Sequence, residues 1–593
     1  MKVNMKSVAA LLVAASLAGS FVSAAEPPTT QAKSTKARKA PKPTVEEQIQ
    51  ALREEFLDQL DSLKRDLAAR DAALKKTQQA AAEAQAAAAK AEADAGVQQQ
   101  ANSDNAAAVS TLKNTVDDVK NANAAVVSSL TDETTAIKKA IASPDALNYK
   151  GITISLAGSF IEAATAWRSA ATGGGINTPF TGVPLQNSDA AQLSEFFGSG
   201  RQSRLAIKAQ GKPPWGTLTG YYEMDWLGTG ITSNNNQSNS YVMRQRQIWA
   251  EIAMHSGTTV SAGQMWSLAA ETTKGTSNGS EILPGTIDPQ YTAGFVWGRQ
   301  YGFRVSQQIG KKFWLAGSVE NAETLNPAGT IVLNSGTSVL LGSAGVGGGL
   351  YNSTANYSFN YTPDFVVKMV TEPGWGHWEL FGIERNFRDR IYVTGSSATN
   401  STAIGAGIGG GFRAPLASKK LTIGLKGLWG QGVGRYGSST IADVTVKPDG
   451  TILPLHGFSA LSTVEASVTP RFSIYMNYGG DYISRAILST TANVGYGNPL
   501  ADMSGCNTEP TAGGQFAPAN PSNCGGNNKD VQEAGFGYWY NFYNGPKGRL
   551  RQGLQYSYIE RNLWSGAGGT TNPGGGAKGT DNIFETSLRY YLP

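Results

Sequence analysis

The chain ends with Asn582-Ile583-Phe584-Glu585-Thr586-Ser587-Leu588-Arg589-Tyr590-Tyr591-Leu592-Pro593. Read with a period of two, this stretch has an apolar, aromatic face and a polar face: Phe584, Thr586, Leu588, Tyr590 and Leu592 against Glu585, Ser587, Arg589 and Tyr591. Such a strand suits the wall of a membrane barrel, where one side meets lipid and the other water. A soluble β-sandwich can also end on a strand of this kind, so the rest of the sequence has to decide.

Composition and the N-terminus indicate an exported β-protein. Hydrophobic residues make up 40% of the 593 residues, and glycine is abundant at 70 residues. No internal apolar run reaches the roughly 18 residues that a membrane-spanning helix needs. Lys2 and Lys6 precede an apolar run and small residues that lead to Ala24 and Ala25. This order predicts a signal peptide over residues 1–25.

The next 118 residues are predicted to form a tether and a long helix. Residues 26–43 are rich in Pro, Thr and basic side chains, which predicts a flexible basic linker. Over residues 44–143, apolar residues recur at spacings of mostly three and four, in two runs that begin at Ile49 and Val109. This spacing predicts a coiled coil, with Asn123 as a residue that sets its register. One amphipathic helix cannot bury its own stripe, so we expect self-association.

After Ser143-Pro144 the pattern changes to strands, and residues 144–593 are predicted to form an all-β barrel of about sixteen antiparallel strands. The expected strands begin near Tyr149, Arg201, Thr217, Tyr241, Thr258, Thr292, Lys312, Asp364, Gly376, Ile404, Lys420, Phe458, Arg471, Glu533, Arg549 and Asn582. Short turns alternate with long loops rich in Gly, Ser, Thr and Asn. This alternation is typical of an outer-membrane barrel, whereas a sandwich or a propeller has no reason to show it.

Parity predicts which side chains face inward on these strands. In the strand that contains Phe536, Tyr538, Tyr540 and Phe542, the aromatic residues form an unbroken outer face. The stretch Arg244-Gln245-Arg246 fits this parity less well, because its arginines do not alternate cleanly with Trp249. A β-bulge or a subunit interface would each resolve the conflict.

Few residues suit catalysis or metal binding. The three histidines, His255, His377 and His456, are scattered, so no enzyme is predicted. Gly405 to Gly411 lacks the strand-before, helix-after context of a nucleotide-binding loop and is interpreted as a glycine-rich barrel strand. Cys506 and Cys524 are the only cysteines and are expected to form a loop disulfide in an oxidising compartment. No metal site or cofactor is expected.

What remains is a pore with a basic lumen. From Lys150 onward the chain has 32 Lys and Arg against 27 Asp and Glu. Parity places Arg204, Lys208, Arg304, Lys426, Arg549, Arg551 and Arg589 inward, against Glu223, Asp225 and Glu585. A low-dielectric wall with one dominant sign of charge concentrates the opposite ion, which predicts a preference for anions.

The third long loop, Ala269 to Tyr291, is our candidate for a loop that folds into the lumen and narrows it. It carries Glu271, Lys274, Glu281 and Asp288. Acidic groups there, opposite a basic wall, would create a transverse electric field. The alternative is that these charged side chains only keep an external loop in contact with water.

The order of signal peptide, helical segment and sixteen-stranded barrel resembles that of the DcaP-like outer-membrane porins. The motifs that carry the resemblance are Tyr149-Lys150-Gly151-Ile152-Thr153-Ile154, Glu195-Phe196-Phe197-Gly198-Ser199-Gly200-Arg201-Gln202-Ser203-Arg204, Ser240-Tyr241-Val242-Met243-Arg244-Gln245-Arg246-Gln247, Gly263-Gln264-Met265-Trp266-Ser267, Thr286-Ile287-Asp288-Pro289-Gln290-Tyr291 and Arg299-Gln300-Tyr301-Gly302-Phe303-Arg304.

The resemblance implies a homotrimer in the lipid of the bacterial outer membrane, with its N-terminal segment in the periplasm. It also implies passive uptake of small anionic solutes, with dicarboxylates as the typical class, and no nucleic-acid partner. It places the basic wall in the stretches that contain Arg201, Arg204, Arg244, Arg246, Arg299 and Arg304. A second hypothesis is a structural tether, in which the coiled coil and the basic linker connect the outer membrane to peptidoglycan.

Overall fold

The computed structural model describes helical residues between 116 and 134, with gaps at 121, 125, 128–129 and 132–133. It also describes residues 146–593, with gaps at 229–232, 234–239, 328–330, 344–357, 508, 510–523 and 569–575. The predicted signal peptide, the linker and most of the predicted coiled coil lie outside the described residues. The N-terminal helix and the barrel belong to two separate units and are described one at a time.

The described residues between 116 and 134 form a helix with an uncovered apolar stripe. Val116, Val119 and Val126 belong to the predicted coiled-coil seam, and all three are exposed in the single chain. Association of this stripe with a second helix stays a prediction. None of the helices in the described part of the chain is long and apolar enough to cross a membrane.

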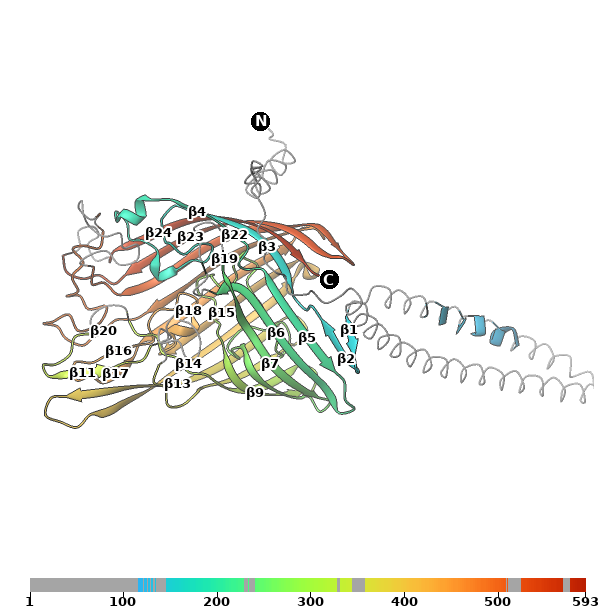
Figure 1. Cartoon of the computed structure of the whole chain (residues 1–593), viewed down its shortest axis with the longest axis horizontal. Coiled ribbons are helices and arrows are strands. Elements are labelled where there is room, and N and C mark those ends of the chain that lie inside the picture. The colour runs from blue at the N-terminus through green and yellow to red at the C-terminus, as the bar shows by residue number, and fades with distance from the viewer. Residues whose placement is uncertain are drawn as a thin grey trace, which may run out of the picture. The chain divides into compact units, whose positions relative to one another are not determined.

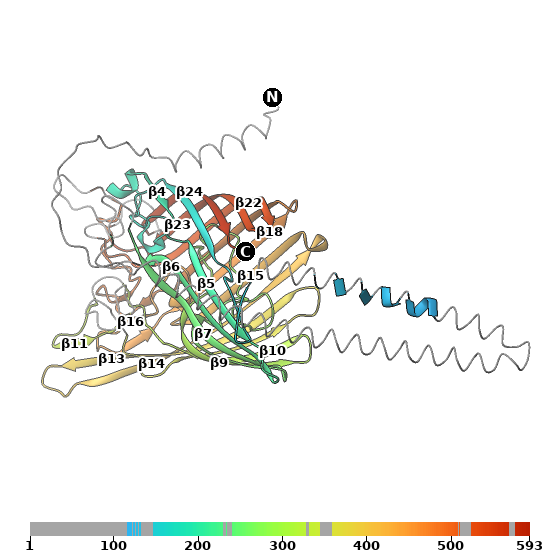
Figure 2. The same ribbon diagram turned by 45° about the vertical axis from the view of Figure 1, so that its right-hand side comes forward.

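Sixteen antiparallel strands close into a barrel, which confirms the expected fold (Figures 1 and 2). The first two wall strands are each interrupted, as β2 (Ile152–Ser155) with β3 (Phe160–Arg168), and β4 (Glu195–Ser199) with β5 (Arg204–Gly211). The others are β6 (Gly216–Gly228), β7 (Val242–Met254), β8 (Thr258–Trp266), β9 (Arg299–Ile309), β10 (Phe313–Glu320), β12 (Asp364–Thr371), β13 (His377–Val393), β14 (Thr399–Leu416), β15 (Leu421–Gln431), β18 (His456–Ser467), β19 (Phe472–Ile483), β22 (Asn528–Gly545), β23 (Gly548–Leu563) and β24 (Lys578–Tyr591).

The C-terminal strand β24 closes the barrel by pairing with β3, where Phe584 lies opposite Trp167 and Ser587 opposite Ala164. Smaller elements decorate the wall. They are β1 (Leu147–Tyr149), β11 (Thr337–Leu340), the hairpins β16 (Val444–Val446) with β17 (Ile452–Pro454) and β20 (Ala486–Ile487) with β21 (Gly495–Tyr496), and the 3-10 helices η1 (Phe180–Gly182), η2 (Asp189–Gln192), η3 (Ala417–Lys419) and η4 (Gly434–Tyr436).

The alternation of short and long connections is present in the structure. Turns such as 255–257, 310–312 and 546–547 join strands at one end of the barrel, which we call the short-turn end. Longer loops gather at the other, long-loop end, where Figure 1 shows β11, β16, β17 and β20. One of these loops holds the disulfide between Cys506 and Cys524.

Side chains on the wall separate into an exposed apolar face and a buried inner face. Trp429, Phe536 and Phe584 are exposed at 59%, 58% and 47%, as the lipid side of a barrel wall requires. Their neighbours Leu428 and Glu585 are buried. The parity read from the sequence therefore holds on these strands.

The glycine-rich stretch Gly405 to Gly411 is part of the wall strand β14, as expected. Glycine is required there because aromatic rings of β13 lie directly over the strand. A Cβ on Gly409 would lie 2.2 Å from the Phe381 ring, and one on Gly405 would lie 2.7 Å from the Phe387 ring. The stretch therefore serves packing inside the barrel.

A β-bulge resolves the parity conflict around Arg244-Gln245-Arg246. Glu223 pairs with Gln247 while its neighbour Met224 pairs with Gln245, so Arg246 is an extra residue in β7. A bulge shifts the facing of every side chain that follows. Trp249, Arg246 and Gln247 are consequently all buried.

The expected strand starts differ from the structure by several residues at a few positions, and the one at Thr292 is furthest off. The strand predicted to begin near Thr292 is β9, which begins at Arg299. The stretch between them includes Ala293, Phe295 and Val296, which are buried against residues inside the barrel. Residues buried inside the barrel are apolar, as the lipid-facing residues of a wall strand are. The sequence pattern of this stretch therefore resembled the start of a strand.

Candidate functional site

The connection between β8 and β9, residues 267–298, lies against inward-facing side chains around the barrel; we call it the inner loop. Its residues Leu268, Ala269, Ile287, Ala293 and Val296 are almost fully buried. It includes the whole stretch Ala269 to Tyr291 that the sequence marked as a candidate for entering the lumen.

Lysines and an arginine of β12, β14 and β15 hold the first half of the inner loop. The Nζ of Lys368 donates to the Ala270 carbonyl at 2.7 Å, and that of Lys426 donates to the Ala269 carbonyl at 2.5 Å. Both lysines also pair with the buried Glu379. On the same side of the loop, the Arg413 guanidinium binds Glu271 at 3.1 Å.

Polar side chains of β19, β22, β23 and β24 hold the second half of the loop. The Ile287 N–H donates to Gln555 at 2.8 Å, and the Ala293 N–H to Glu533 at 2.8 Å. The Gly294 N–H donates to Asp481, and Arg589 donates to the Ile287 carbonyl. The two sets of contacts attach the loop to two successive parts of the wall, β12–β15 and β19–β24.

The variant Gly294→Ala tests this attachment. Gly294 has a φ of 79°, and a Cβ there would lie 1.9 Å from the Ala460 carbonyl oxygen. Backbone strain of this kind costs about 1–3 kcal/mol, and the clash adds to it, so we expect a lower Tm in detergent. The control Gly310→Ala has a φ of 65° and nothing within 4 Å. Equal Tm losses in the two variants would contradict a tight contact at Gly294.

A cavity of about 520 Å³ lies between the inner loop and the short-turn end. Six of the side chains that line it are basic, namely Arg204, Arg246, Lys419, Lys420, Arg551 and Arg589. Asp288 and Glu465 are its acidic lining residues. The excess of positive charge makes the cavity attractive to anions.

Several side chains that line the cavity also have a buried nitrogen without an acceptor among the described residues. Buried nitrogens of five lining side chains lack a hydrogen-bond partner: Gln202 Nε2, Arg204 Nε, Arg246 Nη2, Gln290 Nε2 and Arg551 Nε. The Oε1 atom of Glu465, another lining residue, is also buried without a hydrogen-bond partner among the described residues. Unpaired buried donors are costly, and these nitrogens are not themselves exposed to the cavity.

Carboxylates and aromatic rings fix the arginines in place. Arg246 pairs with Glu223 at 2.6 Å and with Asp225 at 2.7 Å, and Arg589 pairs with Glu162 at 2.8 Å. Arg551 lies over the Trp539 ring, 3.8 Å from its centre. Arg551 has no ion pair in the described part of the chain, so its charge is the least compensated of these three.

The structure places the other predicted basic residues differently. Arg304 and Lys426 face inward, but both hold the inner loop: Arg304 donates to Asn278 at 2.7 Å and to the Trp266 carbonyl at 2.6 Å. Arg299 lies over the rings of both Trp266 and Trp297. The remaining four lie away from the cavity lining: Arg201 stacks on Tyr241, Arg244 pairs with Asp225, Arg549 stacks on Tyr591, and Lys208 is partly exposed on β5.

Of the charged residues predicted on the inner loop, only some face the cavity. Glu271 pairs with Arg413, and Lys274 is exposed. Asp288 faces the cavity and accepts a hydrogen bond from Asn177 at 2.6 Å. Burial raises the pKa of Asp288 to about 6 and the pKa of Glu281 to about 7.

These raised pKa values predict a pH effect on ion selectivity. At pH 8 both carboxyl groups are ionised, and at pH 5 both are neutral, so acidification removes negative charge from the inner loop. We therefore expect the anion-to-cation permeability ratio, measured from reversal potentials, to rise between pH 8 and pH 5. The variant Asp288→Asn should have the higher ratio already at pH 8. A ratio that falls on acidification would contradict this assignment.

Several residues of the site were missed from the sequence. Lys419 and Lys420 lie in and after η3 and line the cavity, but they belong to a turn, where parity does not apply. Lys368 and Arg413 hold the inner loop. The alternation in β12, where Asp364, Val366, Lys368 and Val370 are buried, would have placed Lys368 inside.

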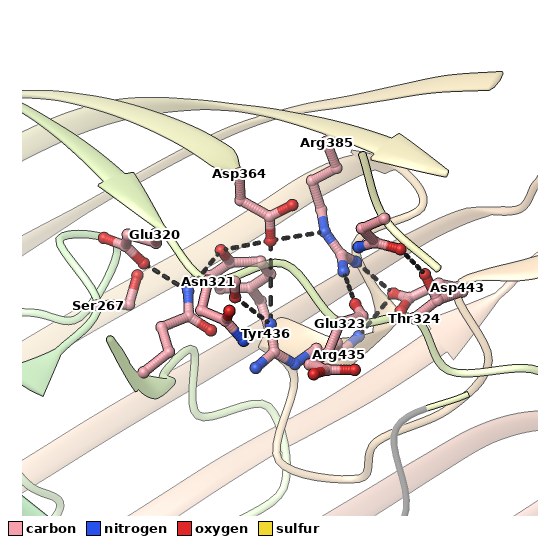
Figure 3. A network of polar contacts seen from close by, with 12 residues as sticks. Ser267, Glu320, Asn321, Glu323, Thr324, Asp364, Arg385, Arg435, Tyr436 and Asp443 are labelled. Carbon is pink, nitrogen blue, oxygen red and sulfur yellow. Dashed lines mark hydrogen bonds and ion pairs between the residues drawn. The ribbon is translucent and has the colours of Figure 1, made fainter. Parts of the chain in front are cut away.

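A second buried polar network lies on the long-loop side of the barrel (Figure 3). The guanidinium of Arg385 on β13 binds Asp364 of β12 at 3.1 Å and Asp443 of the β15–β18 loop at 2.7 Å. The Tyr436 hydroxyl donates to the same Asp364 oxygen at 3.1 Å. Arg385, Asp364, Asp443 and Tyr436 are all at most 1% exposed. The network therefore fixes a long loop to the wall.

No protein-family model matches the sequence, and no curated protein is similar enough to count as a relative. Among solved structures, the chain is similar to the outer membrane channel DcaP of Acinetobacter baumannii, with 13% identity over 75% of this chain and 99% of that chain, and a TM-score of 0.50. OprB of Pseudomonas putida follows with 10% identity, 74% and 94% coverage and a TM-score of 0.39. An anion-selective porin from Comamonas acidovorans has 11% identity, 74% and 99% coverage and a TM-score of 0.38.

Proposed function

We propose that this barrel, which has the fold of the DcaP channel, is an outer-membrane porin for small, preferentially anionic solutes. The observation that carries the proposal is the basic lining of one cavity, where six Arg and Lys side chains stand against two acidic ones. An anion that passes the inner loop would be attracted by this excess of positive charge, whereas a cation would meet an unfavourable potential.

Dicarboxylates fit the arrangement of charge. Arg551 and Arg589 belong to neighbouring strands and both lie over Trp539. Arg204 and Arg246 come from β5 and β7 on another part of the cavity lining. A cavity lined by four arginines suits a solute that carries more than one carboxylate, because guanidinium groups bind carboxylates through directed, bidentate hydrogen bonds.

Conductance in a planar bilayer tests the porin function. With a salt gradient across the membrane, we expect stepwise currents and a reversal potential of the sign that anion selectivity gives. Adding a dicarboxylate should reduce the chloride current in a saturable way. A protein that inserts but conducts no ions would overturn the porin proposal, and cation selectivity would overturn the charge argument.

We also propose that three chains assemble through the N-terminal segment and the barrel, with the segment in the periplasm. The support is the apolar stripe of Val116, Val119 and Val126, which a single chain leaves exposed. Light scattering of the full-length protein in detergent should give the mass of a trimer. A monomeric mass would remove this part of the proposal and leave the channel itself intact.

A further inference from the structure

The turn between β14 and β15, residues 417–420, has an unusual backbone. Ala417, Ser418 and Lys419 have φ angles of 47°, 55° and 69°. Residues other than glycine rarely adopt this left-handed conformation, because their Cβ crowds the following carbonyl oxygen. In the described part of the chain six non-glycine residues have a positive φ, and three of the six are consecutive in this turn. Backbone strain is therefore concentrated here.

The connection of two strands does not by itself call for these residue types. Left-handed turns fit the twist of a β-hairpin, but Gly, Asn and Asp are the residues that adopt them at low cost. Other turns at the short-turn end follow this rule with Gly310, at a φ of 65°, and Gly548, at a φ of 95°. Residues 417–420 are instead Ala-Ser-Lys-Lys. Strain that glycine would relieve indicates a function for the side chains that are present.

Two backbone hydrogen bonds fix the turn. The Lys420 N–H donates to the Ala417 carbonyl at 3.1 Å, and the Ser467 N–H of β18 donates to the Lys420 carbonyl at 2.7 Å. The positions of Lys419 and Lys420 are therefore tied to the sheet. Both residues are exposed, and both line the basic cavity. They consequently lie at the short-turn mouth of this cavity.

The charges of the two lysines are not compensated. Neither Lys419 nor Lys420 makes an ion pair or a side-chain hydrogen bond with any residue that the structure describes. The acidic lining residue on the neighbouring strand is Glu465, the register partner of Thr422, and it already lies 3.7 Å from the Arg413 guanidinium. Both ammonium groups are thus available to an ion in solution.

We propose that residues 417–420 are a selectivity element of the pore, which holds Lys419 and Lys420 at the short-turn mouth, where they collect small carboxylates and guide them to and from the arginines of the basic cavity. The proposal rests on the porin function and adds the residues that set the rate of anion exchange at this mouth. A mouth lined by one sign of charge raises the local concentration and the entry rate of the opposite ion.

Lysine suits a mouth better than arginine does. Its ammonium group is a strongly hydrated point charge on a flexible stem, whereas a guanidinium group binds a carboxylate in a fixed, bidentate geometry. The lysines would therefore attract a passing carboxylate without retaining it. Arg551 and Arg589 line the interior of the same cavity and would bind it next.

Single-channel recording of the full-length protein in a planar bilayer tests the proposal, with succinate as the probe. In the double variant Lys419→Gly/Lys420→Ala, the frequency of succinate blocking events should fall about two- to threefold when succinate is added to one chamber. Two unit charges about 7 Å from an anion, screened by salt, change its local concentration by roughly this factor. Addition to the other chamber should give the wild-type frequency, because the lysines lie at one end of the barrel.

The variant Ser418→Gly is the matched control. It relieves the left-handed backbone in the same turn and keeps both lysines, so the frequency of blocking events should not change. Neither Ser418→Gly nor Lys419→Gly should lower the Tm in detergent, because glycine adopts a positive φ without steric cost. Lys420 has an ordinary φ of −79°, so Lys420→Ala leaves the backbone as it is and decides the question if the double variant does not fold.

Three results would overturn the proposal. The first is a wild-type event frequency on both sides in the lysine variants, and the second is an equal fall on both sides. The third is an equal effect of Ser418→Gly, since the backbone and not the charge would then be responsible. All three presuppose a wild-type channel that conducts and selects anions. A wild-type protein without these properties overturns the porin proposal, and this inference falls with it.

Discussion

The double variant Arg204→Glu/Arg551→Glu is expected to lower the anion-to-cation permeability ratio by at least about tenfold. Both side chains line the basic cavity, and each has a buried nitrogen without an acceptor. Arg551 has no ion pair among the described residues, and Arg204 makes one distant pair with Glu223 at 3.6 Å. Their charges are therefore available to a passing ion.

The size of this effect follows from Coulomb's law. A unit charge about 7 Å from an ion contributes roughly 0.6 kcal/mol in water, so reversing two arginines changes the interaction by about 2.4 kcal/mol. Salt with a Debye length of about 10 Å reduces this to roughly half. The reversal potential in a salt gradient measures the result.

Two control variants distinguish the effect of the cavity arginines on selectivity from the effect of basic residues elsewhere in the barrel. Arg390→Glu changes a charge that pairs with Asn400 on the wall, so it should leave selectivity unchanged. Arg304→Glu should instead loosen the inner loop, because Arg304 holds Asn278 and the Trp266 carbonyl. Equal loss of selectivity in Arg390→Glu and in the double variant would show that the cavity does not control selection.

The variant Arg385→Met is expected to cost about 3–5 kcal/mol of barrel stability, because it leaves buried charges unpaired. Arg385 is fully buried and bridges Asp364 and Asp443, which are also fully buried. Thermal unfolding in detergent, followed by circular dichroism of the β-sheet, measures the loss.

Removing the whole charge cluster is expected to restore much of this stability. The triple variant Arg385→Met/Asp364→Asn/Asp443→Asn contains no buried charge at these positions, and replacing a complete ion cluster is often nearly neutral. Arg390→Met, on the same strand but partly exposed, should change stability by less than about 0.5 kcal/mol. A stable Arg385→Met protein would contradict a structural role for this network.

The barrel wall was predictable because the residue pattern of each strand reflects the environment on its two sides. Lipid on one side and polar lumen on the other impose a period of two, and glycine-rich or proline-containing turns mark where strands end. Trp429 and Lys426 are three residues apart, and their opposite facing follows from parity alone. The boundary at Thr292 was wrong because Phe295 and Val296 are buried against other residues inside the barrel, and such burial favours apolar residues as lipid does.

The site was predictable only in part. Parity identified Arg551 and Arg589 as inward residues, and both line the cavity. It identified Arg304 and Lys426 as well, yet these bind carbonyl groups of the inner loop. Which inward charge meets solvent and which holds a loop depends on where residues 267–298 lie, and no local pattern contains that information.

By itself, the sequence determined the barrel, the number of its strands and the inner or outer facing of most wall residues, because these depend on short-range alternation against two different solvents. The tertiary structure decided the bulge at Arg246, the position of the inner loop and the burial of Arg385 between two aspartates. These features join residues that are distant in sequence, and their energies come from burial and from charge pairing across the barrel. The C-terminal strand illustrates both levels: its alternation marks it as a wall strand, but only its pairing with β3 makes Arg589 part of the cavity.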